Sequence, residues 1–243
     1  PKKRPMDNVA TGWERPQEDE FALCSLGLPT PYRTWAFPRR GPVDADWLTL
    51  EGVDADRLAD WKRRLDQFVR AVTLRRPGRR VVLKSPPHTA RVRTLLEVFP
   101  DARFVHIVRD PSALFPSTVR LWKSLSDVQT LQWTAKRHDW IEEEVLANLV
   151  RMYEAYERDR DLIPDGRLAE LRYEDLVADP MGELRRVYND LDLGDFAAAE
   201  PGVSRYLAAE RDYRTNRFEV PDDVRGRVAE RWGAYAERWG YAA

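Results

Sequence analysis

The chain has 243 residues, 43% of them hydrophobic and 33% charged, and its 40 basic and 41 acidic side chains leave a net charge of −1. This balance argues against a protein bound to nucleic acid or to an anionic membrane, because such proteins normally carry a one-sided excess of charge. There is no run of about 18 apolar residues, so no membrane span is expected. A single cysteine, Cys24, excludes an intrachain disulfide and a zinc site built on several thiolates, and it favours a reducing compartment, the cytoplasm.

The first part of the chain predicts helices joined by loops. One helix is expected near Glu18–Leu26, and the prolines and glycine between Pro29 and Pro42 predict an extended loop. From Asp56 to Leu74 the apolar residues recur at the spacing of one helix face, which predicts an amphipathic helix. These apolar residues are Leu58, Trp61, Leu65, Phe68, Val69 and Val72.

Two short apolar runs, Val81–Leu83 and Phe104–Val108, predict buried strands. A helix is expected after each: the first over Thr89–Phe99, and the second from Asp110-Pro111, a capping residue followed by proline at the first helical position. The order strand–helix–strand–helix implies a parallel sheet with right-handed crossovers.

The rest of the chain continues the same pattern. A third strand is expected at Leu168–Leu171, and helical segments are expected over residues 129–160, 184–191 and 224–239. The predicted fold class is α/β, a parallel sheet flanked by helices. We expect a single domain over residues 1–243, made of a mostly helical and loop segment (1–76), an α/β nucleotide-binding core (80–193) and a helical tail (194–243).

Polar segments follow the first two predicted strands. They are Lys84-Ser85-Pro86-Pro87-His88 and the stretch from Arg109 to Ser117. Ligands of open α/β sheets bind beyond the carboxyl ends of the strands, so neighbouring strands would bring Lys84 and Arg109 to one edge. On spacing alone, an ordinary strand–helix corner with Arg109 in a surface ion pair remains an equal alternative.

These residues resemble the sulfotransferases that use 3′-phosphoadenosine 5′-phosphosulfate (PAPS), most closely a bacterial branch with a Lys-Ser-Pro-Pro-His segment. The resemblance implies a P-loop-NTPase-like sulfotransferase fold. It also implies that Arg109 and Ser117, at the family's eight-residue spacing, hold the 3′-phosphate of PAPS. A guanidinium suits this role because it can bind a phosphate through two hydrogen bonds. In the segment from Leu171 to Leu176, Tyr173 matches the tyrosine that contacts adenine, although a tyrosine packed in the core is the alternative.

The glycine-rich loop that holds the 5′-phosphosulfate in this family is not found in the sequence, and neither is a GxxxxGK[ST] motif. We therefore expect the chain to begin after the family's first strand and loop. Arg217, or Arg214, is expected to assist at the 3′-phosphate.

Sulfuryl transfer is an in-line displacement that needs a cation near the transferring group and a base for the acceptor hydroxyl. The resemblance makes Lys84 the candidate cation, and no metal is indicated. His88 is the first candidate base, although the family's usual histidine position is here Pro86; a first-turn helix residue is the alternative for His88. Glu18 and Glu20 are the second candidates, with acids at a helix N-terminus as the alternative.

Other residues carry weaker expectations. His106 is expected in the core and His138 on a solvated helix face. Tryptophans near the presumed site could wall an apolar acceptor pocket, with core packing as the default for each. These tryptophans are Trp13, Trp35, Trp122 and Trp133.

Three functions stay open on this sequence. The first is PAPS-dependent sulfation of a hydroxyl on a small or lipid-like acceptor. The second is a non-catalytic or fragmentary module that binds adenosine 3′,5′-bisphosphate (PAP). The third is another nucleotide-using transferase on a related sheet, for which no phosphate loop or metal-binding carboxylates are found.

Overall fold

The computed structural model describes residues 2–3, 10–12, 15–132, 139–211 and 221–241. The chain contains two compact units. The first comprises Pro1–Pro100 and Thr118–Arg160, and the second comprises Asp101–Ser117 and Asp161–Ala243. The single domain over residues 1–243 stays a prediction. Within the described ranges, no helix has the length and apolar character needed to cross a membrane.

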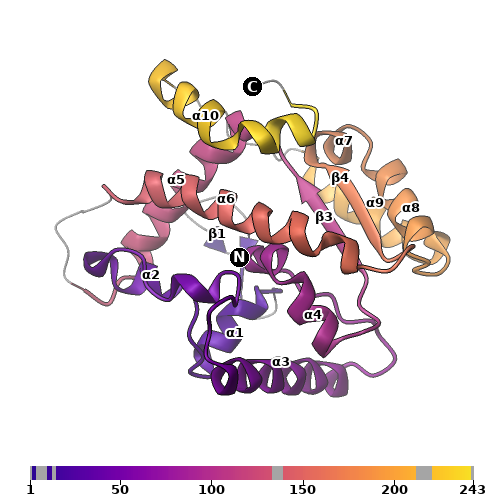
Figure 1. Ribbon diagram of the computed structural model, residues 1–243. Coiled ribbons are helices and arrows are strands. Elements are labelled where there is room, and N and C mark those ends of the chain that lie inside the picture. The colour runs from indigo at the N-terminus through magenta and orange to yellow at the C-terminus, as the bar shows by residue number, and fades with distance from the viewer. Residues whose placement is uncertain (1, 4–9, 13–14, 133–138, 212–220, 242–243) are drawn as a thin grey trace. The chain divides into compact units, whose positions relative to one another are not determined.

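The first unit is mostly helical in the part that the structure describes (Figure 1). Among its described residues, β1 (Lys2–Lys3) pairs antiparallel with β2 (Ala10–Thr11) over two residues. Its α-helices are α1 (Asp19–Ser25), α2 (Arg33–Ala36), α3 (Ala55–Arg75), α4 (Val92–Val98) and α6 (Ile141–Asp159). Its short 3₁₀ turns are η1 (Pro38–Arg40), η2 (Ala45–Trp47) and η3 (Pro86–Ala90).

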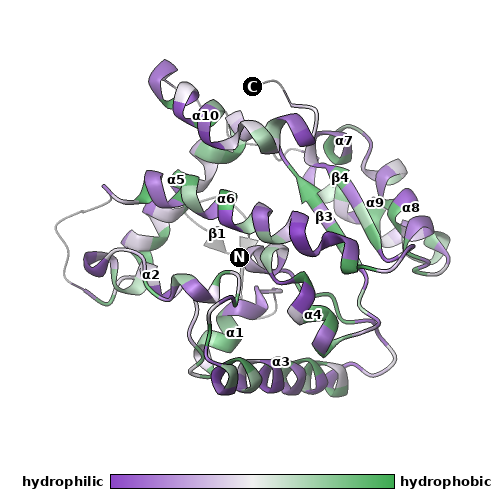
Figure 2. Ribbon diagram, viewed as in Figure 1, coloured by the Kyte–Doolittle hydropathy of each residue, from purple (hydrophilic) through white to green (hydrophobic). Residues whose placement is uncertain are grey.

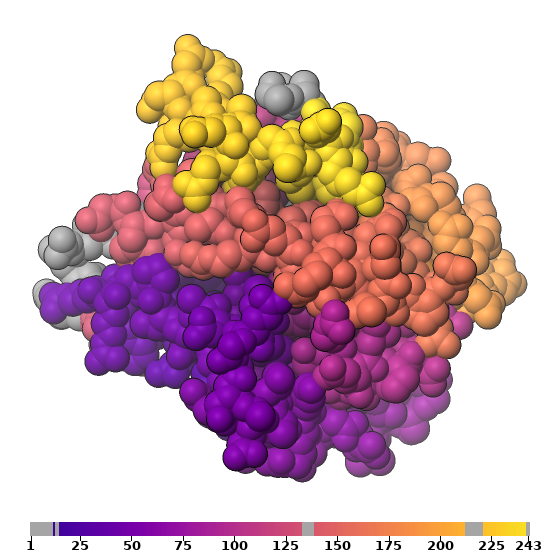
Figure 3. All heavy atoms as spheres, viewed as in Figure 1, coloured from indigo at the N-terminus to yellow at the C-terminus, as the bar shows by residue number. Residues whose placement is uncertain are grey.

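Helix α3 shows how the sequence sets the packing of this unit. Asp54 caps the helix, since its carboxylate accepts hydrogen bonds from the backbone N–H groups of Asp56 (3.1 Å) and Arg57 (3.2 Å). Trp61 and Leu65 are fully buried, and α3 contacts α1 and α4. The other face is hydrophilic (Figure 2) and forms part of the molecular surface (Figure 3). The predicted amphipathic helix is therefore confirmed.

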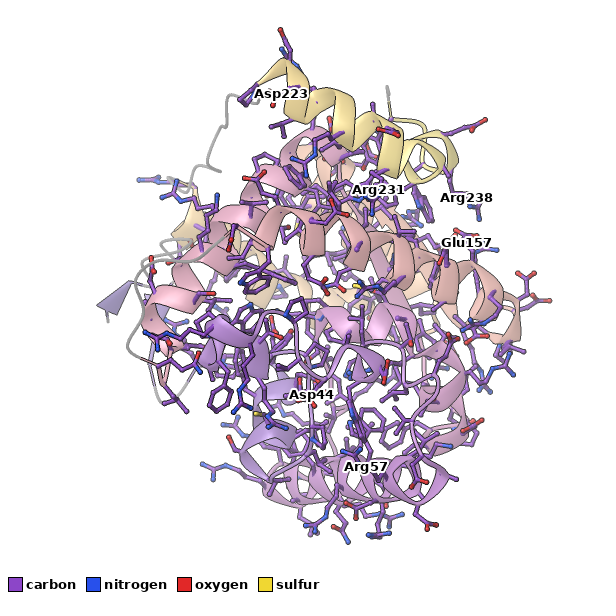
Figure 4. The ribbon with its side chains drawn as sticks, turned by 60° about the vertical axis from the view of Figure 1, so that its left-hand side comes forward. Asp44, Arg57, Glu157, Asp223, Arg231 and Arg238 are labelled. Carbon is purple, nitrogen blue, oxygen red and sulfur yellow. The ribbon has the colours of Figure 1, made fainter. Side chains whose placement is uncertain are left out.

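The turn η2 and the residue before it, Asp44, make side-chain contacts within the same unit. The Arg57 guanidinium lies 5.1 Å from the ring centroid of Trp47, and Asp44 forms an ion pair of 3.0 Å with Arg33. Asp44 and Arg57 are labelled in Figure 4. Of these residues, only Arg33 belongs to the stretch from Pro29 to Pro42 that was expected to be an extended loop, where the structure has α2 and η1. That expectation was wrong because Pro38 stands at the first position of η1, where a missing N–H costs nothing.

The second unit contains the parallel strands β3 (Phe104–Val108) and β4 (Leu168–Arg172). The register runs from Phe104 opposite Leu168 to Val108 opposite Arg172. The helices are α7 (Tyr173–Ala178), α8 (Pro180–Asp190), α9 (Glu200–Glu210) and α10 (Asp222–Arg238). The 3₁₀ turns are η4 (Arg160–Leu162) and η5 (Phe196–Ala198), and η4 starts on the last residue of the first unit. Helix α5 (Pro111–Gln129) begins in this unit and ends in the first.

Helices pack on parts of both faces of this two-stranded sheet, while Val105 and Ile107 of β3 remain about half exposed. On one face, Ala169 and Leu171 of β4 form a buried cluster with Val187 of α8 and with Leu191, the residue that follows α8. On the other face His106 is buried, with its ring 5.4 Å from Trp239 at the end of α10. Figure 2 colours β3 largely as hydrophobic.

Helix α10 has the charge order that a helix dipole favours, with Asp223 in its first turn and Arg238 in its last (Figure 4). The predicted α/β class is confirmed. The strands predicted at Phe104–Val108 and Leu168–Leu171 and the helices predicted over residues 184–191 and 224–239 are also confirmed.

One predicted strand is wrong. Val81–Leu83 does not form a strand, and Val82 is 84% exposed. A strand exists only through pairing, and among the described residues no strand pairs with this run. Lys84 therefore does not follow a strand end. It belongs to the first unit and Arg109 to the second, so the reasoning that placed them at one sheet edge is not supported.

Two predicted helices have different limits. The helix expected over Thr89–Phe99 is shorter, because residues 86–90 form the 3₁₀ turn η3 and α4 begins only at Val92. In the region expected to be helical over 129–160, α5 ends at Gln129 and α6 begins at Ile141.

Candidate functional site

The second unit places Arg109 at a corner between a strand and a helix. β3 ends at Val108, and Asp110 then caps α5: its side chain accepts a hydrogen bond from the backbone N–H of Ser112 at 2.7 Å. The carbonyl of Asp110 accepts from Leu114 at 2.8 Å, so the helix begins at Pro111 as predicted. Arg109 thus stands just outside the positive end of a helix, where an anion is favoured.

Arg109 and Tyr173 are in contact. Val108 pairs with Arg172 at the ends of the two parallel strands, so the next residues of each chain segment, Arg109 and Tyr173, emerge side by side. The guanidinium carbon of Arg109 lies 4.7 Å from the centroid of the Tyr173 ring, a cation–π contact. Two residues that were selected from separate sequence segments therefore share one corner.

Ser117 lies partly buried in α5 of the same unit. It directly follows Pro116, which has no N–H for the carbonyl of Ser112. Arg217 and Arg214 lie outside the described residues.

The first unit presents a second cluster, where the start of α1 meets the segment from Lys84 to Arg91. Three consecutive acidic residues of α1 and its cap each contact a different basic side chain of that segment. Glu18 contacts Lys84, Asp19 contacts His88 and Glu20 contacts Arg91.

The outermost of these pairs joins Glu18 and Lys84. One carboxylate oxygen of Glu18 binds the Lys84 ammonium group, and the other accepts a 2.6 Å hydrogen bond from the Tyr32 hydroxyl. Burial and the neighbouring Glu18 carboxylate raise the pKa of Tyr32, so this phenol stays protonated and acts as a donor. The side chain of Lys84 is 74% exposed and that of Glu18 is 22% exposed, so this pair can be reached from solvent.

The middle pair joins His88 and Asp19 at 2.7 Å between Nε2 and Oδ2. The Ser85 hydroxyl donates to the other oxygen of Asp19 at 2.9 Å. Burial alone would raise the pKa of Asp19, but the hydrogen bond and charge of His88, with the Ser85 hydroxyl, outweigh it and hold this pKa below its ordinary value. The carboxylate therefore remains ionised beside the imidazole.

The innermost pair, Glu20 with Arg91, is fully buried. Arg91 donates to both carboxylate oxygens, at 2.6 Å and 3.2 Å, and the Thr30 hydroxyl donates to Glu20 at 2.5 Å. The guanidinium also donates to the backbone carbonyls of Trp47 and Leu48. A carboxylate held in this way cannot meet a substrate, so its surroundings favour a structural role for Glu20.

A group of aromatic rings lies beside Glu18 in the same unit. The Tyr32 ring is 5.0 Å from Phe21 and 4.4 Å from Trp35, and Trp35 is 5.9 Å from Trp122. Trp140 lies 6.3 Å from Trp122. The structure thus brings together Trp35 and Trp122, two of the tryptophans selected from the sequence.

Comparison with known proteins identifies the family of the chain. Residues 13–197 match the model of the sulfotransferase family. The chain belongs to this family. Two relatives, both named omega-hydroxy-beta-dihydromenaquinone-9 sulfotransferase Stf3, come from Mycobacterium bovis and Mycobacterium tuberculosis. Each is 45% identical over 240 residues, covering 99% of this chain and 61% of the relative, so the chain spans about three fifths of their length.

A solved structure supports the fold. The sulfotransferase STF9 from Mycobacterium avium matches with a TM-score of 0.69 at 20% identity, over 100% of this chain and 60% of that one. The sulfotransferase fold predicted from the sequence is therefore confirmed.

Arg109 has one side-chain nitrogen without a partner among the described residues. This is the Nε atom, which is buried, and a buried polar atom without a partner calls for an explanation. In the described part of the chain, no group of three or more His, Cys, Asp or Glu side chains could hold a metal ion.

Several candidates have other outcomes. His106 is a core residue, as expected, and its Nδ1 lies 3.8 Å from Glu170. Trp13, Trp133 and His138 lie outside the described residues.

The sequence analysis missed Tyr32 and Tyr235. Their hydroxyl groups contact Glu18 and Arg109 across 14 and 126 residues, and no spacing pattern in the sequence indicates such contacts.

Proposed function

We propose that this chain is the part of a sulfotransferase that binds the adenosine 3′,5′-bisphosphate portion of PAPS and supports transfer of its sulfuryl group to a hydroxyl. One observation carries the proposal: the Arg109 guanidinium, at the end of β3 and outside the N-terminus of α5, lies on the ring of Tyr173. A cation, a helix end and an aromatic ring in one place suit a ribose phosphate with an adjoining purine.

Within this proposal, Arg109 and Ser117 bind the 3′-phosphate and Tyr173 contacts the adenine, with Arg217 assisting. PAPS, when bound, supplies the sulfuryl group. Because Tyr173 already carries the guanidinium on one face of its ring, its contact with adenine would use the other face or the ring edge.

On the acceptor side, we assign the base to His88, oriented by Asp19. If Nε2–H donates to Asp19, the lone pair on Nδ1 is available for the acceptor proton, and the Asp19 carboxylate stabilises the imidazolium that forms. Nδ1 is buried and has no hydrogen-bond partner among the described residues, so it can take the proton only from a hydroxyl that enters the first unit beside it.

Glu18 is the second candidate base, since its carboxylate is more exposed than the His88–Asp19 pair and touches Lys84, the proposed cation.

We propose a lipid-like alcohol as the acceptor and the cytoplasm as the place of action. The two Stf3 relatives are named for a hydroxylated menaquinone, which is such an alcohol. The rings of Tyr32, Trp35, Trp122 and Trp140 supply apolar contact area in the unit that holds Glu18 and His88. The single cysteine agrees with a reducing compartment.

The proposal is tested by comparing PAP with 5′-AMP in isothermal titration calorimetry on the full-length protein. PAP should bind more tightly than 5′-AMP, and Arg109→Ala should abolish the difference, because only PAP carries the 3′-phosphate. Arg205→Ala, which removes an exposed arginine from α9, is the control and should keep the preference. Equal affinities for the two nucleotides in the unmodified protein would refute the assignment.

A second experiment separates the enzyme from the non-catalytic module. Turnover with PAPS and a long-chain alcohol should fall strongly in His88→Ala while PAP affinity stays the same. Unchanged turnover in His88→Ala with a loss in Glu18→Gln would move the base to Glu18. Tight PAP binding without any turnover across a panel of alcohols would favour the binding module.

A further inference from the structure

The backbone of Arg109 is held by a residue far away in the sequence. The Tyr235 hydroxyl, on α10, accepts a hydrogen bond from the backbone N–H of Arg109 at 2.9 Å and donates one to the carbonyl of the same residue at 2.8 Å. Tyr235 is 7% exposed, so both bonds are shielded from water. One hydroxyl therefore binds both the backbone N–H and the backbone carbonyl of Arg109.

This contact lies where the strand pairing stops. The last register pair of β3 and β4 is Val108 with Arg172, so Arg109 is the first residue beyond the ladder. A buried backbone donor and acceptor both need partners, and a hydroxyl can serve both because it donates and accepts. Tyr235 extends the hydrogen bonding of β3 by one residue and so fixes the direction in which the Arg109 side chain leaves the backbone.

Tyr235 is itself held firmly within this unit. Its ring stacks on Tyr241 at 6.3 Å with an interplanar angle of 19°, and one turn earlier in α10 the Trp232 ring packs edge-on against Phe115 of α5 at 5.6 Å. A hydroxyl carried by an anchored helix holds its partner in place better than one on a mobile loop does.

A parallel connection supports the next residue. The Tyr241 hydroxyl donates to Glu174 at 2.7 Å, and the other oxygen of Glu174 accepts from the backbone N–H of Asp110 at 3.1 Å. The C-terminal segment therefore supports two consecutive peptide groups, those of Arg109 and Asp110, on either side of the strand–helix turn.

We propose that Tyr235 is a positioning residue for nucleotide recognition: its hydroxyl orients Arg109 so that the guanidinium meets the 3′-phosphate. The inference rests on the proposed function of Arg109. It assigns to α10 a part in selecting PAP over nucleotides without the 3′-phosphate.

Tyr235→Phe tests this, because it keeps the ring and removes only the hydroxyl. By titration calorimetry on the full-length protein, the Kd for PAP should rise about tenfold, because Arg109 loses the two hydrogen bonds that orient it. The Kd for 5′-AMP should stay the same, whereas general destabilisation would weaken both nucleotides. Tyr188→Phe on α8, whose ring packs on Phe196, is the matched control and should change neither.

A double-mutant cycle gives the second readout. In the Arg109→Ala background, Tyr235→Phe should have no further effect on PAP binding, because the residue through which it acts is gone. Additive losses, or an unchanged PAP preference in Tyr235→Phe alone, would overturn the inference while Arg109 still reads the phosphate. If Arg109→Ala keeps the preference for PAP, the proposed function fails first and the inference fails with it.

Discussion

The buried pair of Glu20 and Arg91 offers a sharp test of how the first unit is held together. Glu20→Gln keeps the size of the side chain but removes its charge and replaces one acceptor oxygen with an amide donor. Three hydrogen bonds converge on that carboxylate, two from Arg91 and one from Thr30. The Arg91 guanidinium, fully buried beneath the Trp61 ring, would keep its charge without the paired carboxylate.

The expected cost is large. Breaking a buried ion pair by removing one partner costs about 3–5 kcal/mol, since the remaining charge is left desolvated. With a urea m-value of about 2–3 kcal/mol/M, the unfolding midpoint should fall by about 1–2.5 M. Urea denaturation followed by far-UV circular dichroism measures this shift.

The control is Asp66→Asn, which breaks an exposed i,i+4 pair with Arg70 on α3 of the same unit. It should leave the midpoint nearly unchanged, because solvent screens such a pair. If Glu20→Gln shifts the midpoint no more than Asp66→Asn does, the pair does not hold α1 against the segment from Lys84 to Arg91, and the structural reading of Glu20 is refuted.

Two further predictions concern acid stability and core packing. The pKa of Asp19 is lowered in the folded state, so its ionised form contributes stability that is complete above the ordinary value of 3.8 and is lost as the pH falls below it. Thermal melts between pH 6 and 3 should therefore show a steeper loss of stability for the unmodified protein than for Asp19→Asn. Parallel curves would contradict this. Trp232→Ala removes a buried ring from its edge-on contact with Phe115 and should cost about 3–5 kcal/mol of unfolding free energy in urea titrations; a cost below about 1 kcal/mol would show that α10 is not anchored there.

The sequence predicted the corner at Arg109 well because local rules decide it. An apolar β-branched run, then an aspartate and a proline, specify a strand that passes directly into a capped helix. β4 also passes directly into a helix at Tyr173, although α7 has no capping side chain. Parallel pairing in register then makes the contact between Arg109 and Tyr173 a consequence of the two strand ends.

The failure at Val81–Leu83 has the opposite cause. A strand depends on a neighbour, so an apolar run of three residues carries no information about whether a partner is present. The same limit explains Tyr235, whose contact with Arg109 depends on the packing of α10 and leaves no trace in the local pattern. The sequence analysis considered the acidic residues at the start of α1 as helix-terminus residues. Their pairing with three basic side chains forms only when the first unit folds, because the partners are more than 60 residues away in the sequence.

The three acidic residues at the start of α1 also differ in how deep their partners lie, with side-chain exposures of 74% for Lys84, 13% for His88 and 0% for Arg91. Ionic strength therefore acts chiefly on the first pair, since salt screens charges that are open to water. Protons act on the second pair through Asp19, and the third yields only when the surrounding chain comes apart. Neighbouring positions of one helical turn can thus be probed separately with sodium chloride, acid and urea, without changing a residue.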